Sequence, residues 1–388
     1  MSNADRSRQF MMQFARHEHD LFRYVLILDG PAEFQLVSAE QAFCRSGRLT
    51  AEVPPQATGF RIGTPQAALV DLGTAFALDV KPERAEVHVL KGEVAIRDLP
   101  TSVPNLKEGE AISIERDGRI ARLSAPRASL VSAQELERQV AASRRKQYET
   151  WRAAGPQLNA APGLLARFDF EKESLSGQRV LNVAPNTTVA CGTVVGCGPA
   201  EGRWPGKGAL ELRTLSDRVR VRVPGEYRSL TLAAWVRVDA LDRAFNSLFM
   251  CEGYGAGGFH WQIGRKGDLR LGVKGEHQRA TDYCSPVVFG PDRLGQWSHL
   301  AVVYDADAHQ AAHFVDGAAV SHESLRFEVP LRIGNADIGN WSVGPHSTIY
   351  PVRCFTGRID ELALYGRALA DREIRELYEL GTPKPPQR

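Results

Sequence analysis

The sequence predicts a mainly β protein, built from a small β domain, a connecting amphipathic helix and a two-sheet β-sandwich. Short runs of alternating apolar and polar residues, separated by Gly, Pro, Asn and Asp, fill residues 24–123 and 164–364. A helical pattern separates these two regions, and the length of 388 residues suits two or three domains. We expect an irregular segment at 1–23, a β domain at 24–125, a helical connector and linker at 126–160, the sandwich at 161–383 and a tail at 384–388.

The first β region contains two expected hairpins. Val87 and Val89 alternate with polar residues before Lys91-Gly92, and Val94 and Ile96 alternate after it. This pattern is typical of two strands joined by a tight turn. The residues on either side of the turn at 117–118 show the same alternation, which predicts a second hairpin.

The connector shows helix signals at both ends. Ser132 and Glu135 form a capping box, and Gly155-Pro156 ends the helix. The apolar face is formed by Leu136, Val140, Tyr148 and Trp151.

The second β region has strands at short, regular spacing, which predicts a sandwich or barrel. A short closing helix follows, and it ends near Gly381. Its apolar face is formed by Ala370, Ile374, Leu377 and Tyr378.

Composition excludes several classes of function. The net charge of +2 provides no field that would gather nucleic acid, so we expect no nucleic-acid partner. The longest apolar runs have the length of strands, far below the ~20 residues that cross a bilayer. No CxxC pair occurs among the six cysteines, so a zinc ribbon is unsupported. Cys191 and Cys197 could form a disulfide across a glycine-rich turn, or they could be free, partly buried thiols.

Residues 25–120 resemble a FecR-type domain, an extracytoplasmic β module of bacterial cell-surface signalling. The resemblance lies in TPQAALVDLGTAFALDV at 64–80, EVHVLKGEVAI at 86–96 and LKEGEAISI at 106–114. It implies a periplasmic or cell-envelope location. It also implies a membrane anchor before the domain, which this chain lacks as written.

The second half resembles the laminin-G-like, concanavalin A-like jelly rolls. Matching segments are LTLAAWVRVD at 230–239, GQWSHLAVVYD at 295–305, HFVDGAAV at 313–320 and FTGRIDELALYGRALADREIRELYELG at 355–381. The resemblance implies a domain that binds carbohydrate or a glycoprotein.

Aromatic residues near glycine-rich loops are the expected ligand contacts, because aromatic rings stack on the C–H faces of sugars. For each tryptophan the competing interpretation is core packing. The candidates are Trp261, Trp341, Tyr350, Tyr254 and His346.

Arg218, Arg220 and Arg222 alternate with valines, which places the three arginines on one face of a strand. Such a row could hold sulfated or uronic polysaccharide, and we include Arg220 among the ligand residues. The other interpretation is an exposed sheet edge protected by charge.

Two groups of carboxylates are candidates for catalytic residues. Asp169, Glu171 and Glu173 alternate in sequence, but glycanases of this fold use an ExDxxE arrangement that the chain lacks. We expect them on a solvated outer face. Asp360 and Glu361 are expected to be structural.

A bound calcium ion is the one cofactor the sequence suggests, because loops of sandwich lectins often hold it through hard oxygen ligands. The weak candidates are Asn335, Asp337 and Asn340, and turn chemistry explains them equally well.

These observations favour a non-catalytic recognition protein of the cell envelope, possessing no catalytic residues and linked to FecR-type signalling. Two alternatives remain open: a polysaccharide-degrading enzyme on the same fold, and a structural adhesion module that binds a partner protein.

Overall fold

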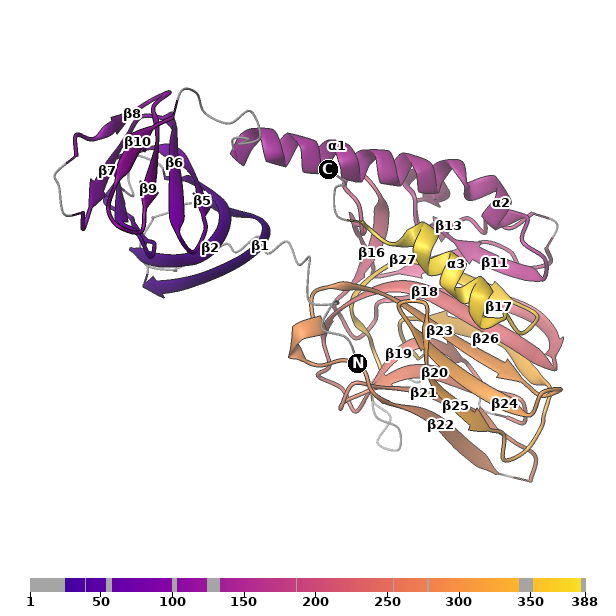
Figure 1. The fold of residues 1–388 in the computed structure, drawn as a ribbon. Helices are drawn as coiled ribbons and strands as arrows, with labels where there is room; N and C mark the ends of the chain where they lie inside the picture. Colours follow the sequence, from indigo (N-terminus) through magenta and orange to yellow (C-terminus); the bar gives the residue numbers. More distant parts are fainter. Residues whose placement is uncertain are drawn as a thin grey trace. The chain divides into compact units, whose positions relative to one another are not determined.

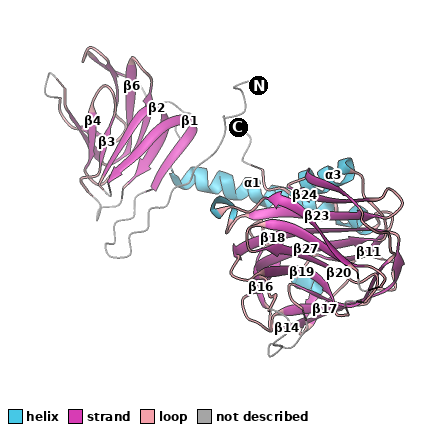
Figure 2. Cartoon of the chain, turned by 90° about the horizontal axis from the view of Figure 1, so that it is seen from below, coloured by secondary structure: helices cyan, strands magenta, loops and turns pink. Residues whose placement is uncertain are grey.

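A computed structural model describes residues 25–38, 40–53, 58–99, 103–123, 133–185, 187–253, 255–277, 279–341 and 352–384. The chain divides into two compact units, one formed by Met1–Ala142 with Pro385–Arg388 and the other by Ser143–Lys384 (Figure 1). Both are built mainly of strands, as expected (Figure 2). In the described part of the chain, no helix is sufficiently long and apolar to cross a membrane.

The first unit contains a ten-stranded sheet with the order β10-β9-β6-β5-β2-β3-β4-β7-β8, and β1 pairs with β2. Its core is lined by alternate residues such as Leu49, Phe76, Leu78 and Val87. The strands are β1 (Val25–Ser38), β2 (Gln41–Glu52), β3 (Arg61–Gly63), β4 (Ala68–Asp71), β5 (Ala75–Val80), β6 (Arg84–Lys91), β7 (Glu93–Arg97), β8 (Leu106–Lys107), β9 (Ala111–Glu115) and β10 (Ile120–Arg122).

One of the two expected hairpins is wrong. The chain does turn at Gly92, with φ of 82°, but β6 pairs with β5 and β9 while β7 pairs with β4 and β8. Val89 and Val94 are both fully buried in the same core. Alternation therefore located the strands correctly, but it could not reveal their partners. The second hairpin is confirmed, because Ile120 pairs with Ile114.

The second unit is a sandwich of two sheets. The eight-stranded sheet has the order β15-β16-β27-β18-β23-β24-β25, with β11 also on β27, and the nine-stranded sheet has the order β12-β13-β14-β17-β26-β19-β20-β21-β22. The first sheet is formed by β11 (Leu164–Phe168), β15 (Gly198–Glu201), β16 (Gly208–Leu212), β18 (Ser229–Ala240), β23 (Trp297–Asp305), β24 (Gln310–Val315), β25 (Ala318–Ser324) and β27 (Thr356–Tyr365). The second is formed by β12 (Leu175–Ser176), β13 (Arg179–Val180), β14 (Gly192–Val195), β17 (Arg218–Tyr227), β19 (Phe245–Cys251), β20 (Phe259–Gly264), β21 (Asp268–Lys274), β22 (Ala280–Val287) and β26 (Leu331–Ile338).

Helices accompany the eight-stranded sheet. The closing helix α3 (Asp371–Gly381) begins where expected, and it buries Ile374 against outward-facing Ala233, Ala301 and Ala363. The remaining helices are α1 (Ala133–Ala153), α2 (Gly155–Asn159) and two 3₁₀ turns, Lys172–Ser174 and Pro291–Arg293.

The connector differs from the expectation at its C-terminal end and in the unit to which its second half belongs. Gly155-Pro156 ends α1 but also begins the short helix α2, because proline is favourable in a first helical turn. The second unit starts at Ser143, so the second half of α1 belongs to the sandwich unit. The expected cap at Ser132 lies outside the described residues.

Candidate functional site

The outer face of the nine-stranded sheet carries the row of arginines predicted from the sequence. Along β17, Val219, Val221 and Val223 are at most 5% exposed and pack in the core between the sheets. The intervening arginines must therefore point away from that core. The Arg220 side chain is 49% exposed and that of Arg218 is 22% exposed.

Strand β17 lies inside the sheet. It pairs with β14 through Thr193 and Val195 on one side, and with β26 along most of its length on the other. The interpretation that the arginines protect an exposed edge is therefore wrong for Arg218 and Arg220, since β17 is paired on both sides at these two residues. A row of like charges inside a sheet needs another explanation.

Arg220 begins a row of residues that crosses five strands on this outer face. Directly opposite neighbours are Arg220 and Asp337, Asp337 and Met250, Met250 and His260, and His260 and Gly272. Residues directly opposite each other share a face. The Asp337 carboxylate is 3.6 Å from Arg220 Nε and 4.0 Å from Arg218 Nε.

Trp341 and Arg353 lie over this row beside His260. The Trp341 indole meets the His260 ring edge-on at 5.0 Å between centroids, and the Arg353 guanidinium is 4.8 Å from the Trp341 ring centroid. Arg353 Nη1 is 3.2 Å from both His260 Nδ1 and Gln262 Oε1. A second contact places the same guanidinium 4.8 Å from the Phe245 ring. The stacked guanidinium and indole form a rigid platform.

His260 is neutral in this arrangement. Burial, together with the nearby positive charge of Arg353, lowers the pKa of the imidazole to about 3. A neutral ring can accept the hydrogen bond that Arg353 donates at Nδ1. His260 therefore holds Arg353 in place without adding a charge of its own.

The structure brings together only part of the predicted ligand set. Arg220 and Trp341 are on the same face of the nine-stranded sheet, but Trp341 is only 9% exposed, so its ring offers little surface to a ligand. Trp261 is a correction, because its indole is fully buried in the core and could contact a sugar only if the sandwich opened. Tyr254, His346 and Tyr350 lie outside the described residues.

The three calcium candidates do not converge. Asn335 and Asp337 share the outer face of β26, where they pair with Arg222 and Arg220. Asn340 uses its amide elsewhere, donating to the carbonyl oxygens of Leu215 at 2.8 Å and Asp217 at 3.1 Å. Within the described ranges no group of three or more His, Cys, Asp or Glu could hold a metal ion.

The expectation of a solvated outer face for the acidic trio at 169–173 is wrong for Glu171, whereas the Glu173 side chain is 65% exposed. Strand β11 ends at Phe168, so the three carboxylates do not share a strand face. Glu171 is 7% exposed, pairs with Lys207 Nζ at 3.1 Å and accepts a hydrogen bond from the Tyr148 hydroxyl at 2.9 Å. It therefore attaches α1 to the sandwich instead of facing solvent.

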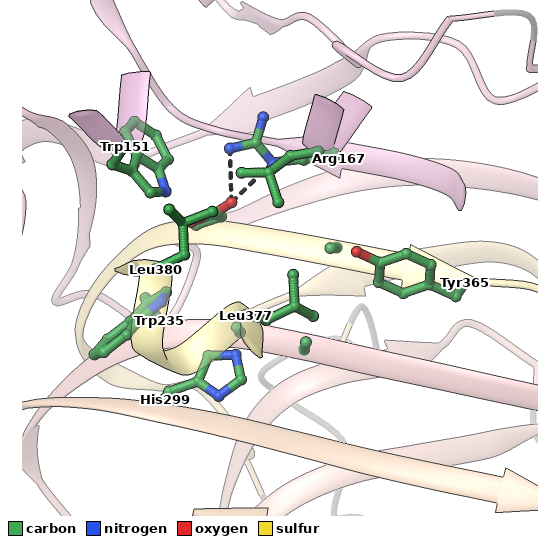
Figure 3. Close-up of a pocket in the computed structure, with 12 residues that line it drawn as sticks. Trp151, Arg167, Trp235, His299, Tyr365, Leu377 and Leu380 are labelled. Atoms are coloured by element: carbon green, nitrogen blue, oxygen red, sulfur yellow. Dashed lines mark hydrogen bonds and ion pairs between the residues drawn. The ribbon is translucent and has the colours of Figure 1, made fainter. Parts of the chain in front are cut away.

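Asp360 and Glu361 lie in a buried ion-pair cluster. Arg203 contacts both carboxylates, and Arg167 Nη2 is 2.7 Å from Glu361 (Figure 3). Burial raises the pKa of Asp360, whereas for Glu361 the opposing effect of Arg167 and Arg203 outweighs burial and lowers the pKa to about 2. Every carboxylate oxygen of this pair is occupied by the protein itself, which leaves no acid or nucleophile for a substrate.

The Cys191–Cys197 disulfide is not formed, and all six cysteines are free thiols. Strand β14 (Gly192–Val195) separates the two residues, and an extended strand rises about 3.3 Å per residue. The two ends of β14 are too far apart for the Cα separation of ~4.4–6.8 Å that a disulfide needs. Burial raises the pKa of the Cys197 thiol to about 12.

His260, Gln262 and Arg353 were missed by sequence reasoning. A signal was present for the first two, because Phe259, Trp261 and Ile263 alternate with them along β20. Applying the period of two would have sent Trp261 inward and His260 and Gln262 outward. Arg353 had no signal, since it reaches the sheet from a loop.

Comparison with known proteins assigns a large part of the second unit to a fold family. The family model for the concanavalin A-like lectin/glucanases superfamily matches residues 216–375, so this part of the chain is a concanavalin A-like jelly roll. No curated protein matches the sequence.

Three similar solved structures illustrate the comparison. The binding domain of Paraclostridial Mosquitocidal Protein 1 is 13% identical with a TM-score of 0.43, covering 56% of this chain and 52% of that one. The Botulinum Neurotoxin serotype G binding domain is 12% identical with a TM-score of 0.43, covering 56% and 51%. Domain 4 of AbnA, a GH43 extracellular arabinanase from Geobacillus stearothermophilus solved with arabinotriose, is 21% identical with a TM-score of 0.41, covering 55% and 98%. The chain thus spans about half the length of the two toxin domains.

Proposed function

We propose that the concanavalin A-like domain of this chain is a non-catalytic recognition module that binds acidic carbohydrate or glycoconjugate on the outer face of its nine-stranded sheet. The observation that carries the proposal is the arginine row on β17, an interior strand where charge is not needed to protect an edge.

The charge balance of the row supports an anionic ligand. Arg218, Arg220 and Arg222 face outward, and Asp337 is the carboxylate directly opposite Arg220. Guanidinium groups bind carboxylate and sulfate through paired N–H donors, which suits uronic acids and sulfated sugars. Arg353, which is partly exposed and held over the buried Trp341 ring, continues the same face and adds a further cation.

Binding of polysaccharides to the intact chain tests the proposal. Polygalacturonate and dextran sulfate should bind, and unmodified dextran should bind much less. Arg220→Ala should weaken acidic binding by about tenfold, the loss of one charge-assisted hydrogen bond. Arg372→Ala is the matched control, because Arg372 is 88% exposed on α3. Equal affinity of wild type and Arg220→Ala for both acidic polymers would remove the basis of the proposal.

The enzyme alternative has one favourable observation, the contact of His260 with Arg353 on the same face. A histidine and an arginine could serve as base and charge stabiliser in polysaccharide cleavage. Burial keeps His260 neutral, but only 3% of the residue is exposed, so a substrate could hardly reach it. Its Nδ1 already accepts a hydrogen bond from Arg353. Binding is therefore the better interpretation. Release of unsaturated or reducing ends from polygalacturonate, abolished by His260→Gln, would favour the enzyme.

For the first unit we propose a FecR-type role in the cell envelope, resting on the sequence motifs alone. The module would pass ligand occupancy of the jelly roll to a partner protein. Fractionation of cells that produce the tagged chain tests the location, and recovery only from the cytoplasm would contradict it.

A further inference from the structure

A cleft lies against the outer face of the eight-stranded sheet, which is the sheet opposite the one that carries the arginine row. This cleft of about 520 Å³ includes Glu201, Arg203, Gln296, Asp316, Thr382 and Pro383 in its lining. Its volume falls within the ~300–1,000 Å³ usual for small-molecule sites. All of these residues belong to the sandwich unit.

Three tryptophans and a tyrosine form the aromatic part of the lining: Trp204, Trp235, Trp297 and Tyr378. Two of the indoles are occupied by internal contacts. The Trp204 ring lies 4.5 Å from the Arg203 guanidinium, and the Trp235 ring stacks on Tyr378 with 5.8 Å between centroids. Trp204 and Trp235 are 1% and 3% exposed, so they form the rigid floor of the cleft.

Trp297 differs from the other two. It lies two residues before His299 on β23, so both side chains point outward from the same face of the sheet. Its side chain is partly exposed, and among the described residues no ring or guanidinium stacks on it. The guanidinium of Arg237, directly opposite on β18, is engaged by both carboxylate oxygens of Asp239 at 2.8 and 2.9 Å. Trp297 thus presents an indole that the fold itself does not use.

A carboxylate is held in a fixed position at the same cleft. Asp316 accepts a hydrogen bond from the His299 backbone N–H at 3.0 Å and from Arg293 Nη1 at 2.8 Å. Its φ is 50°, in the Asp-Gly turn between β24 and β25. The carboxylate still has 28% of its side chain exposed, so it can accept a hydroxyl hydrogen bond from a ligand.

We infer that this cleft is a second ligand site, which takes a neutral pyranose sugar with one ring face stacked on Trp297. The charged groups in the lining balance, since Arg203 is neutralised by Asp360 and Glu361, Asp316 by Arg293, and Arg144 opposes Glu201. Such a lining attracts no net charge, unlike the arginine row on the other sheet. An aromatic face beside a fixed carboxylate and an amide is the chemistry that recognises a sugar through its C–H and hydroxyl groups. This site goes beyond the proposed function and does not depend on it.

Calorimetric titration of the full chain with cellohexaose, xylohexaose and mannohexaose tests the inference. At least one of the three should bind at millimolar concentration or below. Trp297→Ala should weaken that binding by about tenfold, and Trp297→Phe, which keeps a ring, should restore most of it. Circular dichroism should show that both variants are folded, because Trp297 is outside the core.

The control separates this site from the arginine row. Arg220→Ala should leave neutral-sugar binding unchanged, and Trp297→Ala should leave binding of polygalacturonate unchanged. Failure of all three oligosaccharides to bind would overturn the inference, as would a folded Trp297→Ala variant with wild-type affinity. A proline-rich peptide that binds through Trp297 while no sugar does would overturn it too.

Discussion

Arg203 and Asp360 form an ion pair in which neither side chain has any exposed surface. The backbone N–H of Arg203 also donates to the Asp360 carboxylate at 2.8 Å, and Arg203 Nε donates to the carbonyl oxygen of Gly381 at 2.8 Å. One guanidinium thereby joins the loop before β16, strand β27 and the end of α3.

Removing Asp360 should destabilise the sandwich strongly. Asp360→Ala would leave Arg203 buried without its principal counter-charge, which costs about 3–5 kcal/mol in comparable buried pairs. Urea unfolding followed by tryptophan fluorescence measures the effect. All six tryptophans lie between 151 and 341, so the signal reports the second unit alone. Glu376→Gln on the exposed face of α3 should change stability by less than about 0.5 kcal/mol. A loss below about 1 kcal/mol for Asp360→Ala would show that the pair is dispensable.

Buried histidines should make the sandwich unit sensitive to mild acid. Burial lowers the pKa of His299 to about 4 and that of His313 to about 4, from an ordinary value of 6.5. Below pH 6.5 these histidines bind protons in the unfolded chain but stay neutral in the folded domain. The free energy of unfolding therefore falls as the pH is lowered from about 6.5 to about 4. His299 alone contributes up to about 3 kcal/mol of this loss.

The stability curve of His299→Gln provides the check. Between pH 6.5 and 4 it should be flatter than that of the wild type, because glutamine does not titrate. Parallel curves for the two proteins would mean that His299 has the same pKa in the folded and unfolded states, which would contradict the effect of burial.

Glu361 should act in a lower pH range. Its pKa is about 2 against an ordinary 4.5, so its contribution is complete above about pH 4.5 and is lost as the pH falls toward 2. The stability difference between wild type and Glu361→Gln should be about 3 kcal/mol at pH 7 and should shrink toward zero near pH 2. A difference that is constant with pH would contradict the ion pairs with Arg167 and Arg203.

The sequence predicted the elements of the sandwich better than their partners. Alternation placed the valines of β17 in the core and its arginines outside, since a strand's faces follow directly from the order of residues. The ion pair of Glu171 with Lys207 joins residues 36 positions apart, and Arg203 with Asp360 joins residues 157 apart. No local pattern encodes such contacts, because the tertiary fold alone brings the groups together. Trp261 is misplaced for another reason: it lies beside a glycine-rich loop, but its position in the alternation of β20 points it into the core.

The second half of α1 should behave as part of the sandwich unit. Trp151 is 4% exposed, and its ring lies 5.0 Å from the Arg203 guanidinium, 5.3 Å from that of Arg167 and 4.9 Å from Lys207 Nζ. The indole ring stabilises these three cations through cation–π contacts, which replace part of their interaction with water. Trp151→Ala should therefore destabilise the sandwich by about 3–5 kcal/mol, the usual cost of removing a buried indole. Glu149→Gln, on the exposed face two residues earlier, should have almost no effect.

Hydrogen exchange should show the same boundary, with amides after Ser143 protected as strongly as the sandwich strands. If α1 were a simple linker, Trp151→Ala would leave the urea midpoint of tryptophan fluorescence unchanged.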